Sequence, residues 1–137
     1  MRLALLALTL LAASPGPTRA AEAAPAATSA AFSACMDRSG GVTVAMRDCF
    51  AAETQQQDRR LNTVYRQLTR DLEAPPRAKL LRAQRAWLAY RKAECELAMA
   101  PDEGGTLALV TGDDCWLRLT AERVRQLEQH RDAFGAR

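Results

Sequence analysis

Four cysteines are the feature that most limits how this 137-residue chain can fold. Cys35, Cys49, Cys95 and Cys115 all follow an apolar amino-terminal segment, and their number is even. In an exported chain, an even set of cysteines indicates two disulfides. The local pairing joins Cys35 to Cys49 and Cys95 to Cys115, and each loop closure would stabilise the fold by roughly 3 kcal/mol. Crossed pairings remain open at this point.

Residues 1–23 predict a signal peptide. Arg2 supplies a positive start, Leu3–Ala13 form an apolar run, and small residues follow two prolines. Cleavage after Ala20 or after Ala23 would satisfy the rule of small residues around the cut, and we prefer the second position. The apolar run is too short for a membrane span, which needs about 20 residues. We therefore expect a periplasmic or secreted protein with no membrane span after cleavage.

Two regions are expected after the signal peptide. Residues 24–34 are mostly Ala, Pro, Ser and Thr, a composition that can bury little surface and predicts a flexible tether. The folded domain is expected over residues 35–137. A domain of about 100 residues has a small core, so covalent links contribute much to its stability.

The charges of the chain argue against a nucleic-acid partner. There are 19 Lys and Arg residues and 16 Asp and Glu residues. Cleavage after Ala23 would remove Arg2, Arg19 and Glu22, leaving 17 bases and 15 acids, a balance of +2. Both signs are interspersed along the sequence, which is typical of an ordinary solvated surface.

Metal chemistry and catalysis are not expected. The chain has one histidine, His130, which lies far from the cysteines in sequence, and it has no Cys-x-x-Cys motif. We therefore expect no metal site and no cofactor. No motif supplies a nucleophile together with a base, so no catalytic residue and no enzymatic activity are predicted.

Apolar spacing and helix breakers predict three helices and no strands. The first covers about residues 43–73 and the second about residues 76–99. The third begins near Thr106 or, after a bend at Gly112, near Asp113. The prolines at 75 and 76 separate the first two helices, because proline cannot continue a helix but can begin one.

The short connection at residues 74–76 predicts an all-α fold: an antiparallel helical hairpin with a third helix packed across it and two disulfides. With the turn centred there, Asp58 lies level with Arg91, and Tyr65 lies level with Gln84. Asp58, Asn62, Gln84 and Arg91 are polar and lie on or beside the apolar stripes, where a polar group needs a partner. We therefore expect a polar ladder made of the pairs Asp58–Arg91 and Tyr65–Gln84.

The same geometry places all four cysteines near one end of the bundle. Cys49 lies level with the end of the second helix, so the crossed pair Cys49–Cys95 competes with the local pairing that we expect.

The loop between the second and third helices is the most protruding candidate for contact with a partner. Its residues are Asp102, Glu103, Gly104 and Gly105.

A set of motif residues runs through the three predicted helices. It comprises Asp58, Leu61, Asn62, Tyr65, Gln84, Arg85, Trp87, Arg91, Thr120 and Arg123. Together with the cysteines and Gly104-Gly105-Thr106, this set resembles the LprI-like lysozyme-inhibitor family over about residues 35–128. The resemblance is strongest from Ala83 to Trp87, followed by Arg91 and Cys95. Thr106 departs from the serine expected there, but threonine also caps helices.

This resemblance implies a small exported helical domain with paired cysteines, which we expect over residues 35–137. It also implies that the domain binds a protein partner and, as for some members, blocks a cell-wall muramidase of the lysozyme type by binding. Most of the motif residues fall on helix stripes, so we expect them to have structural roles.

The alternative function is a non-inhibitory structural or adaptor module of the cell envelope, because the same helices and disulfides would serve it. Common lysozymes are strongly basic, and a balance of +2 gives no long-range attraction to them. The cluster of Asp102, Glu103, Asp113 and Asp114 would have to supply that attraction locally.

Overall fold

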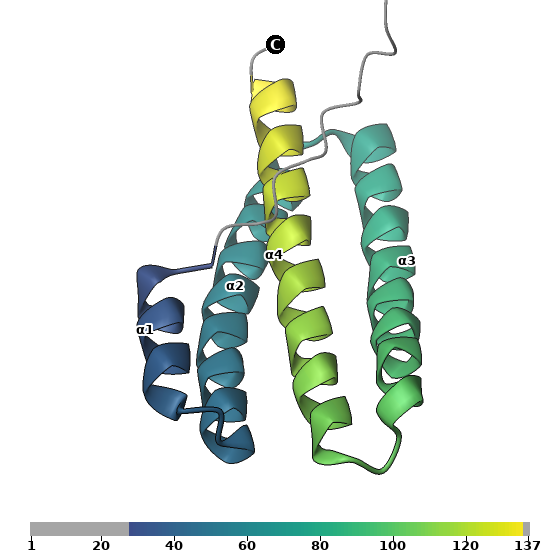
Figure 1. Ribbon diagram of the computed structural model, residues 1–137. Helices are drawn as coiled ribbons and strands as arrows, with labels where there is room; N and C mark the ends of the chain where they lie inside the picture. Colours follow the sequence, from purple (N-terminus) through teal and green to yellow (C-terminus); the bar gives the residue numbers. More distant parts are fainter. Residues whose placement is uncertain (1–27, 136–137) are drawn as a thin grey trace, which may run out of the picture.

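The computed structural model describes residues 28–135, and almost all of them are helical (Figure 1). The elements are α1 (Ala30–Ser39), α2 (Thr43–Asp71), α3 (Ala74–Met99), the short 3-10 helix η1 (Ala100–Asp102) and α4 (Thr106–Gly135). The all-α prediction is confirmed. The predicted signal peptide lies outside the described residues. Within residues 28–135, no helix combines the length and apolar composition that a membrane span requires.

Helix α1 was not predicted. Its first half occupies residues that were expected to belong to the flexible tether, so the expected end of the tether was wrong. Residues 30–34 are helical, whereas the tether was expected to reach residue 34. Ser29 caps the helix by accepting a hydrogen bond from the Phe32 N–H at 3.1 Å. A side-chain cap of this kind satisfies a backbone donor that the helix itself leaves unpaired. The folded domain therefore begins before Cys35.

The prolines at 75 and 76 mark the boundary between α2 and α3, as predicted, and they lie in the first turn of α3. Leu72 is extended after α2, and α3 begins at Ala74 with proline in its first turn. Proline is tolerated there because the first N–H groups of a helix have no partner inside the helix. The Arg77 guanidinium donates to the Leu72 carbonyl at 2.7 and 3.0 Å and closes the turn.

Helix α4 holds the long helices together. It packs extensively against α2 and also along α3, whereas α2 and α3, which run antiparallel, contact each other at few points (Figure 1). The third long helix is thus the main packing partner of both arms of the hairpin. The largest core cluster takes residues from all three helices: Leu61, Val64, Leu68, Leu72, Leu80, Val124 and Leu127.

Both disulfides have the predicted local pairing. Cys35 is bonded to Cys49, which joins α1 to α2, and Cys95 is bonded to Cys115, which joins α3 to α4. The bundle therefore has two distinct ends (Figure 1). We call the end with the disulfides and the α3–α4 loop the cysteine end, and the opposite end with the α2–α3 turn the proline end.

Candidate functional site

The motif residues meet in the middle of the bundle around one arginine. The guanidinium of Arg91 lies between two tryptophan rings, 4.5 Å from the ring centre of Trp87 and 4.2 Å from that of Trp116. Both contacts are cation–π interactions, which strengthen when water is excluded. Arg91 is a buried residue, so this stack joins α3 to α4 inside the structure.

Hydrogen bonding completes the surroundings of Arg91. Its Nη1 donates to the Thr120 hydroxyl at 2.8 Å, and that hydroxyl donates to the Trp116 carbonyl at 2.7 Å. The predicted pair with Asp58 is present, with 3.6 Å between Nη1 and the carboxylate oxygen. Burial lowers the pKa of Arg91, and the charge of Asp58 acts against that shift. The Asp58 side chain is 43% exposed, so it contributes as a partly solvated ion pair.

The predicted second pair of the ladder is wrong. Gln84 is buried, but its side-chain oxygen accepts a hydrogen bond from Nε of Arg123 at 3.0 Å, and Tyr65 is not its partner. The reason is the position of α4, which packs on both α2 and α3 and places Arg123 beside Gln84. The prediction considered the hairpin alone and so missed this pair between α3 and α4.

A cleft of about 400 Å³ opens between α2 and α3 beside this cluster. Most of the motif residues line it, with Leu81 and Leu88: Asp58, Leu61, Asn62, Tyr65, Gln84, Arg85, Trp87 and Arg91. Asn62 and Arg85 are exposed at its rim, and Leu61 belongs to the core. Across residues 28–135, no group of three or more His, Cys, Asp or Glu residues is arranged to hold a metal ion.

The α3–α4 loop forms the tip of the cysteine end. Asp102, Glu103, Gly104 and Gly105 are all exposed, as expected of a protruding loop. The Gly105 N–H donates to the Asp102 carbonyl at 2.9 Å, and Gly104 has a positive φ of 85°, which favours glycine. Helix α4 then starts at Thr106 and continues through Gly112 without a break, which settles the two alternative start points.

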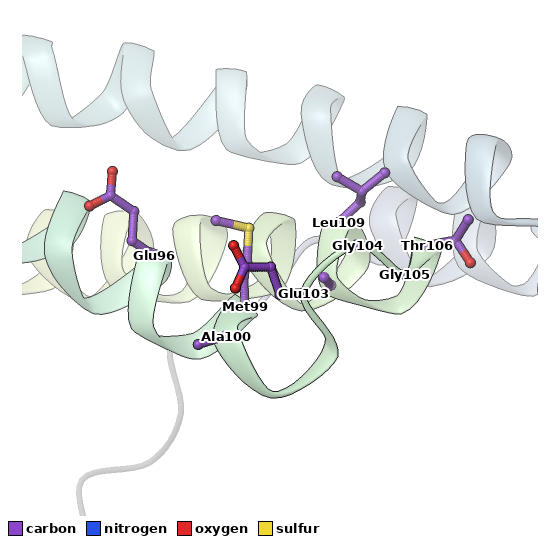
Figure 2. A pocket seen from close by; sticks show the side chains of 9 residues that line it. Glu96, Met99, Ala100, Glu103, Gly104, Gly105, Thr106 and Leu109 are labelled. Atoms are coloured by element: carbon purple, nitrogen blue, oxygen red, sulfur yellow. The ribbon is translucent and has the colours of Figure 1, made fainter.

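A second hollow, of about 460 Å³, lies beside this loop (Figure 2). Its lining mixes carboxylates and apolar groups: Glu96, Met99, Ala100, Glu103, Gly104, Gly105, Thr106, Ala108 and Leu109. A Cβ atom at position 112 would lie 2.6 Å from the Met99 sulfur, so glycine there lets Met99 pack closely on α4. The hollow is thus framed by fixed helices on both sides.

Apolar side chains are unusually exposed around the same tip. Leu97 is 68% exposed on α3, and Leu107 and Leu109 are 58% and 43% exposed on α4. Val42 and Val44, where α2 begins at the same end, are 61% and 70% exposed. The cysteine end therefore carries several exposed apolar side chains that a protein partner could cover.

The fold separates charges that are interspersed in the sequence. The segments at the cysteine end, residues 35–50 and 92–118, hold eight acids and four bases, a net charge of −4. Residues 51–91 and 119–135 hold seven acids and twelve bases, a net charge of +5. Two of the bases at the cysteine end are already paired, Arg47 with Asp113 at 2.7 Å and Lys92 with Glu96 at 2.6 Å. Asp102 and Glu103 have no ion-pair partner among residues 28–135.

Comparison with known proteins gives one family and two curated relatives. The family model described as "Lysozyme inhibitor LprI" matches residues 35–127. An uncharacterized protein of Rhizobium meliloti (strain 1021) is 38% identical over 50 residues, which is 36% of each chain. The uncharacterized protein YecT of Escherichia coli (strain K12) is 29% identical over 103 residues, with 64% of each chain covered. The chain thus spans less than two thirds of either relative, and no solved structure matches it.

Proposed function

We propose, from the premise that this chain belongs to the LprI lysozyme-inhibitor family, that it binds a muramidase of the lysozyme type and blocks it without any chemistry of its own. The partner would be met in the periplasm or in the secreted fraction. Two disulfides support that location, because such bonds persist in oxidising compartments. The predicted signal peptide over residues 1–23 would take the chain there.

The observation that carries this proposal is the charge of the cysteine end. The net charge of the whole domain offers a basic enzyme no attraction, but the cysteine end alone carries −4. Charge complementarity between two surfaces raises the rate of association and excludes wrong orientations. A basic muramidase would therefore approach the tip of the α3–α4 loop in preference to the positive proline end.

The apolar side chains at the tip would supply most of the contact. Leu97 on α3 and Leu107 and Leu109 on α4 flank the loop that carries Asp102 and Glu103, and all of them are exposed. In protein interfaces, buried apolar groups contribute most of the affinity, and a charged rim mainly sets rate and orientation. The combination suits a partner whose cleft is rimmed by bases, and occupation of that cleft would exclude the saccharide.

The loop is also anchored at its base. The Cys95–Cys115 disulfide joins α3 and α4 just behind the tip, with 5.5 Å between the two Cα atoms. A surface that is already ordered loses less conformational entropy on association, which favours binding. This is the arrangement expected of a rigid inhibitor that covers a cleft.

A turbidity assay tests the proposal. The purified oxidised protein is mixed with lysozymes of several types and a cell-wall suspension, at low and at physiological salt. We expect slower clearing with micromolar protein, and a smaller effect at the higher salt because screening weakens the attraction. If no lysozyme type is inhibited at either salt concentration, the adaptor function, binding to another envelope protein, replaces inhibition.

A further inference from the structure

The proline end contains a cavity that the proposed inhibition does not use. It has a volume of about 430 Å³ and lies between α2, α3 and α4. Leu68, Leu72 and Leu80, all buried members of the core, form part of its wall, and Phe134 near the end of α4 forms another part. The volume lies at the lower end of the ~300–1,000 Å³ range of small-molecule sites.

One wall of this apolar cavity is a buried cation. Arg123 is only 7% exposed and lines the cavity. Its hydrogen bonds go to neutral amides, Nε to Gln84 at 3.0 Å and Nη1 to Gln126 at 3.1 Å. Within residues 28–135 no carboxylate lies within ion-pair distance of it. Burial lowers the pKa of the Arg123 guanidinium, and no carboxylate acts against that shift.

A buried charge without a counter-ion is costly, and proteins normally pair such charges. Arg91, the other buried arginine of the core, has a carboxylate nearby, Asp58 at 3.6 Å, whereas Arg123 has two neutral amides and the Trp87 ring at 5.8 Å. A ligand that suits Arg123 would therefore carry a negative charge on an apolar body that fits the cavity. Lys79 and His130, both exposed, stand at the rim of the same cavity, and the Lys79 ammonium adds to its positive potential.

We propose that this cavity binds a single-chain fatty acid, with its carboxylate on Arg123 and its acyl chain along Leu68, Leu72 and Leu80. The carboxylate supplies the missing counter-ion, and the chain covers the apolar wall. A single chain is chosen because the cavity is at the small end of the range of ligand sites. This site is at the opposite end of the bundle from the tip, so the proposal does not depend on lysozyme inhibition.

Calorimetry with the full mature chain tests the proposal. Decanoate is titrated into the protein at concentrations below those at which decanoate forms micelles. Two controls are titrated in the same way: 1-decanol, which has the alkyl chain without the carboxylate, and acetate, which has the carboxylate without the long chain. We expect saturable 1:1 binding of decanoate and at least tenfold weaker binding of both controls, which corresponds to about 1.4 kcal/mol or more. Decanoate should also raise the melting temperature, because a ligand that binds only the folded state stabilises it.

Variants then locate the ligand. Arg123→Gln should weaken decanoate binding at least tenfold, whereas Arg123→Lys, which keeps the charge, should lose less. Since Arg123→Gln also disturbs the core, Ala83→Trp provides a second variant: Ala83 is exposed and lines the cavity, so the indole would block it. Ala78→Trp, exposed on the same helix but outside the cavity lining, is the matched control and should bind like the unmodified protein.

Three results would overturn the proposal. The first is decanol binding as tightly as decanoate, which would show that the charge is not recognised. The second is Ala83→Trp binding decanoate normally, which would place the ligand elsewhere. The third is binding to anionic phospholipid vesicles without any binding of decanoate, which would mean that the positive end adsorbs to membranes and holds no fatty acid.

Discussion

Ser29 donates two hydrogen bonds to the carboxylate of Glu53, one from its N–H at 3.0 Å and one from its hydroxyl at 2.6 Å. Glu53 lies on α2 and is only 4% exposed, and its carboxylate also accepts from the Gln57 amide at 3.2 Å. Ser29 is at the same time the cap of α1. One buried carboxylate therefore fastens the start of α1 to α2, at a position separate from the Cys35–Cys49 disulfide.

Replacement of Glu53 by glutamine should loosen this attachment. The side chain keeps its shape, but its amide group would face the donors of Ser29, so the free energy of unfolding should fall by roughly 1–3 kcal/mol. Urea denaturation measures the loss, and faster hydrogen exchange confined to α1 would locate it. The control is Gln55→Glu, the reverse exchange at an exposed position on the same turn of α2, which should leave stability unchanged.

The same carboxylate should make stability depend on pH. Burial raises the pKa of Glu53, but the hydrogen bonds from Ser29 and Gln57 outweigh burial, and the net shift is downward. A group with a lowered folded pKa contributes stability above its unfolded value of about 4.5 and loses it as the pH falls through the folded pKa. The stability difference between the unmodified protein and Glu53→Gln should therefore shrink below that pH. A difference that is constant from pH 7 to pH 3 would contradict this account.

Arg91 and Asp58 should differ sharply in their effects on stability. Arg91→Ala removes the stack between two tryptophans and leaves the Thr120 hydroxyl without its donor, so a loss of roughly 2–4 kcal/mol is expected. Asp58→Ala removes a half-exposed charge at 3.6 Å and should cost less than about 1 kcal/mol. Chemical denaturation compares the two. Equal losses would mean that the ion pair, and not the tryptophan stack, holds Arg91 in place.

The two disulfides should have separable roles. Each loop closure contributes roughly 3 kcal/mol on the chain-entropy model. Replacing Cys95 and Cys115 by alanine frees the helices that carry the α3–α4 loop and should weaken both stability and inhibition. Replacing Cys35 and Cys49 should lower stability and spare inhibition, because that bond joins only α1 to α2. If inhibition falls equally in both variants, global stability and not loop order controls it.

The features that could be predicted from the sequence are those that depend on residue spacing and helix breakers within neighbouring segments. The prolines that follow a stripe of leucines predicted the α2–α3 turn. Counting residues back from that turn along both helices predicted that Asp58 lies beside Arg91. Helix α1 has only a short apolar stripe, Phe32, Cys35 and Met36, which does not suffice to predict a helix. The helix is held to the domain by the Ser29 cap and its bonds to Glu53, by a disulfide, and by the Phe32 ring packed on Phe50. The Gln84–Arg123 pair depends on how α4 packs against α3, which spacing within a single hairpin cannot supply.

Charge was the hardest property to predict for the candidate site. Acids and bases alternate along the chain, so the sequence suggested an even surface. The acids around the α3–α4 loop were evident as a local cluster, but the net charge of the whole end became evident only when folding brought residues 35–50 and 92–118 together. The loop residues Asp102, Glu103, Gly104 and Gly105 were predicted as contacts from their protrusion and from the acids clustered around the loop, and the neighbouring leucines were not part of that prediction.

The charge of the tip gives the sharpest test of the proposed inhibition. Asp102→Lys with Glu103→Lys reverses two unpaired charges at the cysteine end, and a basic muramidase should then associate more slowly and be inhibited less at low salt. The matched control is Asp71→Lys with Glu73→Lys, which makes the same change of charge on exposed residues at the proline end. Stopped-flow association and the turbidity assay should separate the two double variants at low salt and bring them closer at physiological salt. If both variants lose inhibition equally, net charge alone governs binding. If the tip variant inhibits as well as the unmodified protein, the α3–α4 loop is not in the contact.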